Sequence, residues 1–240
     1  IGNLGALLGV YVHLFRKVGI RFARITRADF WRSFRQSNTF FLSRIASTAY
    51  TAANTVILDI LSAGTSTAFY SSADKLITTA KNGLSPISDS LYPYMTKNRD
   101  FKLVKKVLCI IMPVILAGCA VVFIWAEPLC TWFFGPGYGQ TAPVLRAMLP
   151  VVVVILPSYI LGFPTLSAMG LSKYANYSVI FGSVLHICNL CALYFSGHMN
   201  MITLGILVSI AETAILAFRV VVILRHRELL VTPPDTEEET

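Results

Sequence analysis

The chain has 240 residues, of which 55% are hydrophobic and only 13% charged, whereas soluble domains carry about 25% charged residues. This composition excludes a water-soluble fold, because the exterior of such a fold must be largely polar. The formal net charge of +8 does not indicate a nucleic-acid partner, because the basic residues lie in short segments between apolar runs, as in membrane proteins.

Apolar runs of membrane-spanning length recur along the chain. A helix crosses the bilayer core with about 20 mostly apolar residues. The first run, residues 1–15, is a partial span without an initiator Met, so we expect the chain to be a piece of a longer protein. Further spans are predicted at residues 37–61, 65–91, 104–126, 147–169, 177–194 and 201–224. The sequence thus predicts an all-α polytopic transmembrane bundle of about six to seven spans, with residues 37–224 as its complete part.

Basic residues alternate between the loops. Lys and Arg gather in every second connection, at residues 16–36, 97–106, 170–176 and 225–227, whereas the connections between them carry few or none. Positively charged loops stay on the cytoplasmic side of a membrane. We therefore expect residues 16–36 to form a basic cytoplasmic loop and the C-terminus to be cytoplasmic.

Two segments outside the predicted spans have distinct compositions. Within the basic loop, Phe30, Trp31 and Phe34 alternate with arginines, which fits either a short interfacial helix or a simple basic linker. The tail, residues 225–240, ends in prolines and acidic residues, and we expect it to be disordered.

Charged and polar residues form stripes on three of the predicted spans. At about 100° per residue, Lys81 and Ser85 share a helix face with Asp74, and Lys75 lies at its edge. The span 37–61 carries Arg44 and Asp59 on one stripe, and Glu212 and Arg219 lie seven residues apart on the last span.

These stripes predict a cationic cavity. A charge at the centre of a membrane helix costs about 2.5–3.5 kcal/mol on insertion scales, so such residues mark cavities or pathways. The predicted lining consists of Arg44, Asp74, Lys75, Lys81 and Ser85, and the predicted ion-coupling residues are Glu212 and Asp59. The alternative is a set of internal salt bridges, for example between Arg44 and Asp74. Arg219, near the cytoplasmic end, is expected to snorkel to the interface.

Motifs of catalytic or metal-binding sites are not recognisable in the sequence. There is no nucleophile elbow, no H-E-x-x-H and no paired metal-ligand motif. We therefore expect a protein that is not an enzyme, with neither a metal nor an organic cofactor. Coupling to a proton or sodium gradient is left open.

Two stretches resemble a known family. The first is Phe69–Ile77 continuing through Gly83–Pro93, and the second is Phe133–Tyr138 followed by Ala142–Arg146. Together they resemble the O-antigen flippases, the polysaccharide-repeat transporters of the multidrug/oligosaccharidyl-lipid/polysaccharide exporter superfamily. The resemblance covers residues 27–227.

The resemblance implies a function in the bacterial inner membrane. Such proteins move undecaprenyl-pyrophosphate-linked repeat units to the periplasmic leaflet by alternating access between two bundles, and this chain would supply the C-terminal half. The implied partners are the lipid-linked oligosaccharide, membrane lipid and a polysaccharide polymerase complex. Arg44 and Lys81 would then bind the pyrophosphate, because cationic side chains form strong charge-assisted hydrogen bonds with phosphate oxygens.

Other readings make different demands on the sequence. A multidrug or cation exporter of the same superfamily would need an acidic or apolar cavity, which the excess of Arg and Lys opposes. A non-transporting scaffold of the polysaccharide assembly machinery would use the charges only to bind neighbouring helices. A membrane glycosyltransferase or polymerase would need a large periplasmic loop, but the longest outer loop, residues 127–146, is short.

Overall fold

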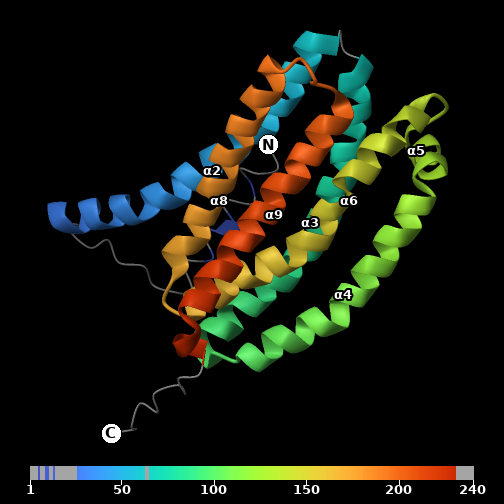
Figure 1. The fold of residues 1–240 in the computed structure, drawn as a ribbon. Coiled ribbons are helices and arrows are strands. Elements are labelled where there is room, and N and C mark those ends of the chain that lie inside the picture. Colours follow the sequence, from blue (N-terminus) through green and yellow to red (C-terminus); the bar gives the residue numbers. More distant parts are fainter. Residues whose placement is uncertain (1–4, 6–8, 11–12, 14–25, 63–64, 231–240) are drawn as a thin grey trace, which may run out of the picture. The chain divides into compact units, whose positions relative to one another are not determined.

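The computed structural model describes residues 5, 9–10, 13, 26–62 and 65–230, and the chain divides into two units, residues 1–38 and 39–240 (Figure 1). Most of the predicted partial span, residues 16–25 of the predicted basic loop and the last ten residues of the tail lie outside the described residues. The structure therefore bears mainly on the predicted bundle, which belongs to the second unit.

The second unit consists of long helices joined by short connections (Figure 1). The six spans predicted from residue 37 onward each coincide with helical structure. The helices are α2 (Arg27–Ser62, beginning in the first unit), α3 (Thr65–Asn98), α4 (Phe101–Ile124), α5 (Ala126–Phe134), α6 (Thr141–Ile160), α7 (Leu166–Ala168), α8 (Ser172–Phe195) and α9 (Met201–Arg225). A π-helical turn (Leu161–Thr165) separates α6 from α7, and 3₁₀ turns cover Tyr138–Gln140 and Arg227–Leu230.

Helix α2 begins well before the predicted start of its span. The ring of Phe30 stacks on that of Phe34 at 6.1 Å between centroids, and Trp31 meets Phe34 edge-on at 5.7 Å. Aromatic pairs one turn apart stabilise a helix. Residues 27–36 are therefore helical, but they belong to the long helix α2 and do not form a separate short helix; their place at the membrane interface stays a prediction.

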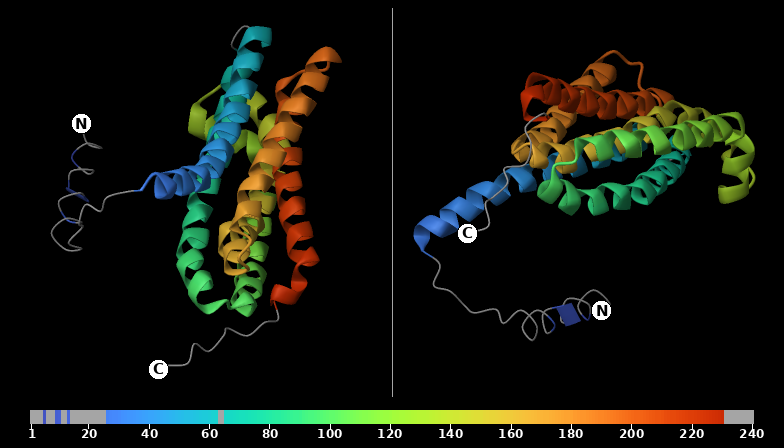
Figure 2. Two further views of the ribbon diagram at one scale, coloured as in Figure 1. Left: turned by 90° about the vertical axis from the view of Figure 1, so that its left-hand side faces the viewer. Right: turned by 90° about the horizontal axis from the view of Figure 1, so that it is seen from below.

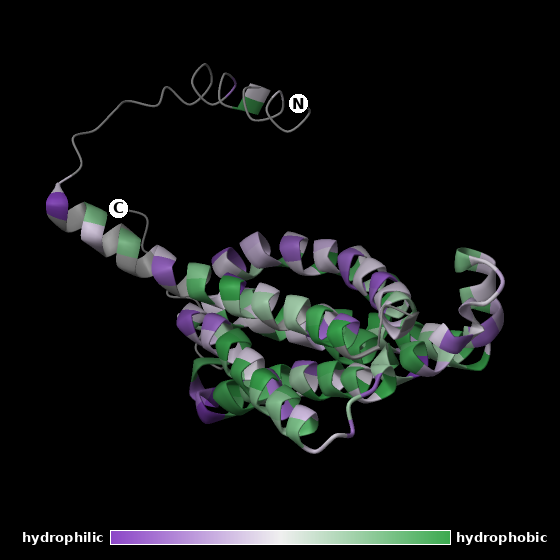
Figure 3. Cartoon of the chain, turned by 90° about the horizontal axis from the view of Figure 1, so that it is seen from above, coloured by the Kyte–Doolittle hydropathy of each residue, from purple (hydrophilic) through white to green (hydrophobic). Residues whose placement is uncertain are grey.

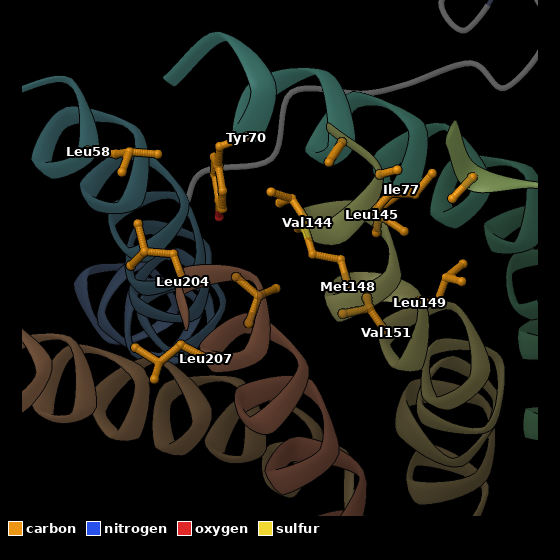
Figure 4. Packing of buried hydrophobic residues seen from close by; sticks show 14 of the residues in the cluster. Leu58, Tyr70, Ile77, Val144, Leu145, Met148, Leu149, Val151, Leu204 and Leu207 are labelled. Atoms are coloured by element: carbon orange, nitrogen blue, oxygen red, sulfur yellow. The ribbon is translucent and has the colours of Figure 1, made fainter. Parts of the chain in front are cut away.

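The core of the second unit centres on α6, which packs against α3, α9 and α4, while α8 packs on α9. The helices run lengthwise beside one another (Figure 2). Leu145 and Met148 of α6 are fully buried between Ile77 of α3 and Leu204 of α9 (Figure 4). These contacts bury one apolar face of each of α3, α6 and α9 inside the bundle.

Small residues allow α8 and α9 to approach closely. A Cβ on Gly182 of α8 would lie 2.3 Å from Cγ1 of Ile215 on α9, so only glycine fits there without movement. Helix pairs in membranes commonly use such small residues, because backbone proximity increases van der Waals contact.

Four helical segments of the described part are long and apolar enough to cross a membrane: Phe101–Ile124, Tyr138–Ala168, Ser172–Phe195 and Met201–Arg225. Helices α2 and α3 have the length but not the apolar composition, because polar residues line them; hydrophilic residues within the bundle are visible in Figure 3. The all-α polytopic membrane fold is thus confirmed. By length and composition, four helices of the described residues qualify as membrane spans, fewer than the six to seven that the sequence predicts.

The helix break between α6 and α7 contains Gly162 and Pro164. Pro164 has no N–H to donate to the carbonyl of Ile160, and the hydroxyl of Thr165 donates to that carbonyl instead at 2.8 Å. Gly162 has a non-helical ψ of −116° within the π-turn. Pro86 and Pro113, by contrast, lie inside helices that continue without interruption.

Candidate functional site

A cavity of about 1030 Å³ lies among α2, α3, α6, α8 and α9, entirely within the second unit. We call it the polar cavity. Its charged lining residues are Arg44, Lys81, Asp89, Glu212 and Arg219. Three cations thus face two carboxylates, and the lining carries a net positive charge.

The structure brings some of the predicted site residues together and not others. Three residues that were predicted to line a cavity do line the polar cavity: Arg44, Lys81 and Ser85. Glu212, which was predicted to couple an ion, lines it as well. The remaining predicted residues do not line it: Asp74 is half-buried on α3, Lys75 is exposed, and Asp59 is exposed near the end of α2.

An ion pair joins α3 to α9 at the polar cavity. The ammonium Nζ of Lys81 lies 2.7 Å from Oε1 of Glu212, whose side chain is 6% exposed, against 22% for Lys81. Breaking a buried pair by removing one partner is strongly destabilising, because the other charge is left uncompensated. Lys81 and Glu212 were each singled out from the sequence, but their pairing was not predicted, since 131 residues separate them.

Arg44 has a different environment. It is exposed on α2 and lines the polar cavity, and among the described residues its guanidinium has neither a hydrogen-bond partner nor an ion-pair partner. The alternative pairing with Asp74 is therefore not formed. The neighbouring Ser43 is buried and donates to Oδ1 of Asn176 at 3.1 Å, which fixes this part of α2 against α8.

The expected position of Arg219 at the membrane interface was also wrong. Instead of snorkelling, Arg219 is 6% exposed inside the bundle. Its Nε donates to the hydroxyl of Ser178 at 2.8 Å, and its Nη1 donates to the hydroxyl of Ser158 at 2.9 Å and also to the carbonyl of Ser158. The shared helix face of Glu212 and Arg219 was the signal that could have placed Arg219 in the cavity.

Gly162 makes room for this guanidinium. A Cβ at Gly162 would lie 2.8 Å from Nη1 of Arg219, closer than side-chain packing allows. The non-helical turn at Gly162 therefore leaves space for the guanidinium of Arg219 on α9. The backbone of the α6–α7 break lies directly against this guanidinium.

A second polar cluster ties α2 to α3 and α8 outside the polar cavity. The amide of Asn54 donates to the hydroxyl of Tyr70 at 3.1 Å, and its Oδ1 lies 2.8 Å from Nε2 of His186. All three side chains are at most 2% exposed. Buried polar groups of this kind are hydrogen-bonded because an unsatisfied one is costly, so the cluster fixes how the three helices meet.

Comparisons with known proteins agree with the resemblance seen in the sequence. A family model described as "Polysaccharide biosynthesis protein" matches residues 1–99, a region that includes Arg44, Lys81 and Ser85. A "Putative O-antigen transporter" of Shigella dysenteriae is 26% identical over 175 residues, which are 71% of this chain and 44% of that relative. The matched region thus spans less than half the relative's length, and no solved structure matches the chain significantly. The predicted resemblance of this chain to the polysaccharide-repeat transporters is thereby confirmed.

Proposed function

We propose that the chain forms one helical bundle of a flippase in the bacterial inner membrane. The cargo is an undecaprenyl-pyrophosphate-linked O-antigen or polysaccharide repeat unit, carried to the periplasmic leaflet by alternating access. The observation that carries the proposal is the polar cavity inside the helical bundle, in which three cations outnumber two carboxylates. Pyrophosphate is a strong anion, and its charge-assisted hydrogen bonds gain strength in a site of low dielectric constant.

The position of the polar cavity along α3 supports loading from the cytoplasm. Its lining on α3 runs from Lys81 to Tyr92, towards the end of the helix that is followed by the basic residues Arg99 and Lys102. By the positive-inside rule this end, like the C-terminus, is cytoplasmic. In this orientation the cationic groups meet the pyrophosphate where it first arrives, while the polyprenyl tail stays in membrane lipid.

The proposed partners follow from the cargo. The lipid-linked oligosaccharide and membrane lipid contact the bundle directly, and a polysaccharide polymerase complex receives the repeat unit on the periplasmic side. Energy coupling by a proton or sodium ion is assigned to Glu212, since Asp59 lies outside the polar cavity. The test is transport in proteoliposomes by the Glu212→Gln variant. If its pH dependence equals that of the wild type, Glu212 does not have that role.

An exporter of cationic drugs is the second candidate. Asp89 and Glu212 in the polar cavity are the observation that favours it. Glu212, however, is already neutralised by Lys81, so the cavity offers a lipophilic cation a single carboxylate beside two arginines. Resistance to cationic drugs that depends on Asp89 would favour this candidate over the flippase.

The flippase proposal is tested in cells with charge variants of Arg44. Arg44→Ala should lower surface polysaccharide while lipid-linked repeat units accumulate in the inner leaflet. Arg44→Lys keeps the charge but loses the bidentate fork, so it should retain part of the transport. Lys75→Ala is the matched control, because Lys75 is exposed and does not line the polar cavity. Normal surface polysaccharide in Arg44→Ala at wild-type protein levels would contradict the proposal.

A further inference from the structure

Arg219 is a buried cation that hydrogen bonds hold in place, but not all of its N–H donors have an acceptor among the described residues. Its Nε and Nη1 are fixed by the serines on α8 and α6, whereas no described residue accepts a hydrogen bond from Nη2. Each terminal guanidinium nitrogen carries two N–H donors. Arg219 also lines the polar cavity, where a ligand could accept hydrogen bonds from its remaining N–H donors.

Purely neutral groups hold the cation in place. Both serines provide hydroxyl or carbonyl oxygens, and the described residues contain no carboxylate within ion-pair distance of Arg219. Glu212, the nearest acidic residue along α9, is paired with Lys81. A buried charge without a counter-ion is costly, so an arrangement that retains one is suited to an anion that comes and goes.

We infer that Arg219 is a preorganised receptor for the phosphate oxygens of an anionic ligand, and that it acts together with Arg44 in the polar cavity. This inference rests on the proposed function and names the residues that take the diphosphate of the lipid-linked cargo. Lys81 is not the primary contact, because Glu212 already neutralises it. Arg219 requires no rearrangement on binding, since two of its three nitrogens are fixed beforehand; Arg44 is exposed and adapts to the ligand.

The receptor is also joined to the helix break. Nη1 binds the carbonyl of Ser158, which lies one turn before the non-helical Gly162, and packs where a Cβ of residue 162 would be. Gly162→Ala therefore displaces the guanidinium without changing any charge. Gly118→Ala on α4 is its matched control, because nothing lies within 4 Å of a Cβ there.

The test is the binding of inorganic pyrophosphate to the purified protein in detergent, measured by isothermal titration calorimetry. Arg219→Gln should bind pyrophosphate roughly tenfold to a hundredfold more weakly than the wild type, as expected for the loss of contacts to a charged group. Gly162→Ala should weaken binding in the same direction and Gly118→Ala should not. Ser178→Ala removes one hydrogen bond that holds the guanidinium but keeps the cation, so it should lose less pyrophosphate affinity than Arg219→Gln does.

The possible outcomes separate this inference from the proposed function. Folded Arg219→Gln with wild-type affinity, alongside weakened binding by Arg44→Gln, would overturn the role of Arg219 and leave the flippase proposal intact. A wild-type protein that does not bind pyrophosphate would overturn both. If Arg219→Gln does not fold, Gly162→Ala and Arg219→Lys decide, and unchanged affinity in both would again overturn the inference. Phosphatidylglycerol micelles that compete as well as pyrophosphate would indicate a phospholipid headgroup site and overturn the assignment to a diphosphate.

Discussion

The ion pair between Lys81 and Glu212 should contribute measurably to the stability of the bundle. Loss of one partner from a buried pair costs about 3–5 kcal/mol. The Lys81 side chain is 22% exposed, so water screens part of the interaction and the lower end of that range applies, about 3 kcal/mol for Lys81→Met or Glu212→Gln. The double variant leaves no uncompensated charge, and its cost should fall well below the sum of the two single costs.

A double-mutant cycle measures this coupling. Unfolding of the purified protein in mixed micelles, followed by the loss of helical circular dichroism, gives the free energy of unfolding of each variant. Lys75→Met is the matched control, because Lys75 is exposed on the same helix and a surface substitution of this kind changes stability by about 0.5 kcal/mol or less. Strict additivity of the two single variants would refute the reasoning, since uncoupled residues add.

Three further predictions concern packing, the buried polar cluster and topology. Gly182→Ala should lower thermal stability because its Cβ would lie 2.3 Å from Ile215, whereas Gly118→Ala, in open space, should not; equal melting temperatures would contradict the close packing of α8 on α9. Asn54→Leu should cost about 1–3 kcal/mol of unfolding free energy, because it removes one hydrogen bond from each of two buried side chains; an unchanged denaturation midpoint would contradict this role. A reporter fused after Lys97 should be cytoplasmic, and one fused at Gly137 periplasmic; a periplasmic signal at Lys97 would invalidate the orientation.

The helices could be predicted from the sequence because their signal is local. Apolar runs of bilayer length and the residues between them define each helix, and the six spans from residue 37 onward coincide with helical structure. Polar stripes at helical spacing were also sufficient to single out Arg44, Lys81 and Glu212. The sequence analysis overestimated the apolar character of α2 and α3, because the polar stripes that identify the cavity also lower the hydropathy of these two helices.

The contacts inside the site could not be predicted, because they join distant parts of the chain. Lys81 could have paired with several acidic residues, and only packing of α3 on α9 selects Glu212. Arg219 was assigned to the interface by its place near a helix end, but the break at Gly162 creates the space that buries it. A helix break depends on how neighbouring helices compensate the lost hydrogen bonds, which a single sequence does not reveal.

The central claim is that the polar cavity carries a diphosphate-linked glycolipid across the membrane. The most direct measurement is the translocation of an undecaprenyl-pyrophosphate-linked repeat unit by the purified protein in liposomes, followed by enzymatic access to the sugar from the outside. We predict that the wild type exposes the sugar faster than protein-free liposomes and that Arg44→Ala is slower by roughly tenfold to a hundredfold, the effect of losing contacts worth about 1.5–3 kcal/mol. A wild-type rate no faster than that of protein-free liposomes would contradict the account. An Arg44→Ala rate equal to the wild-type rate would contradict it as well.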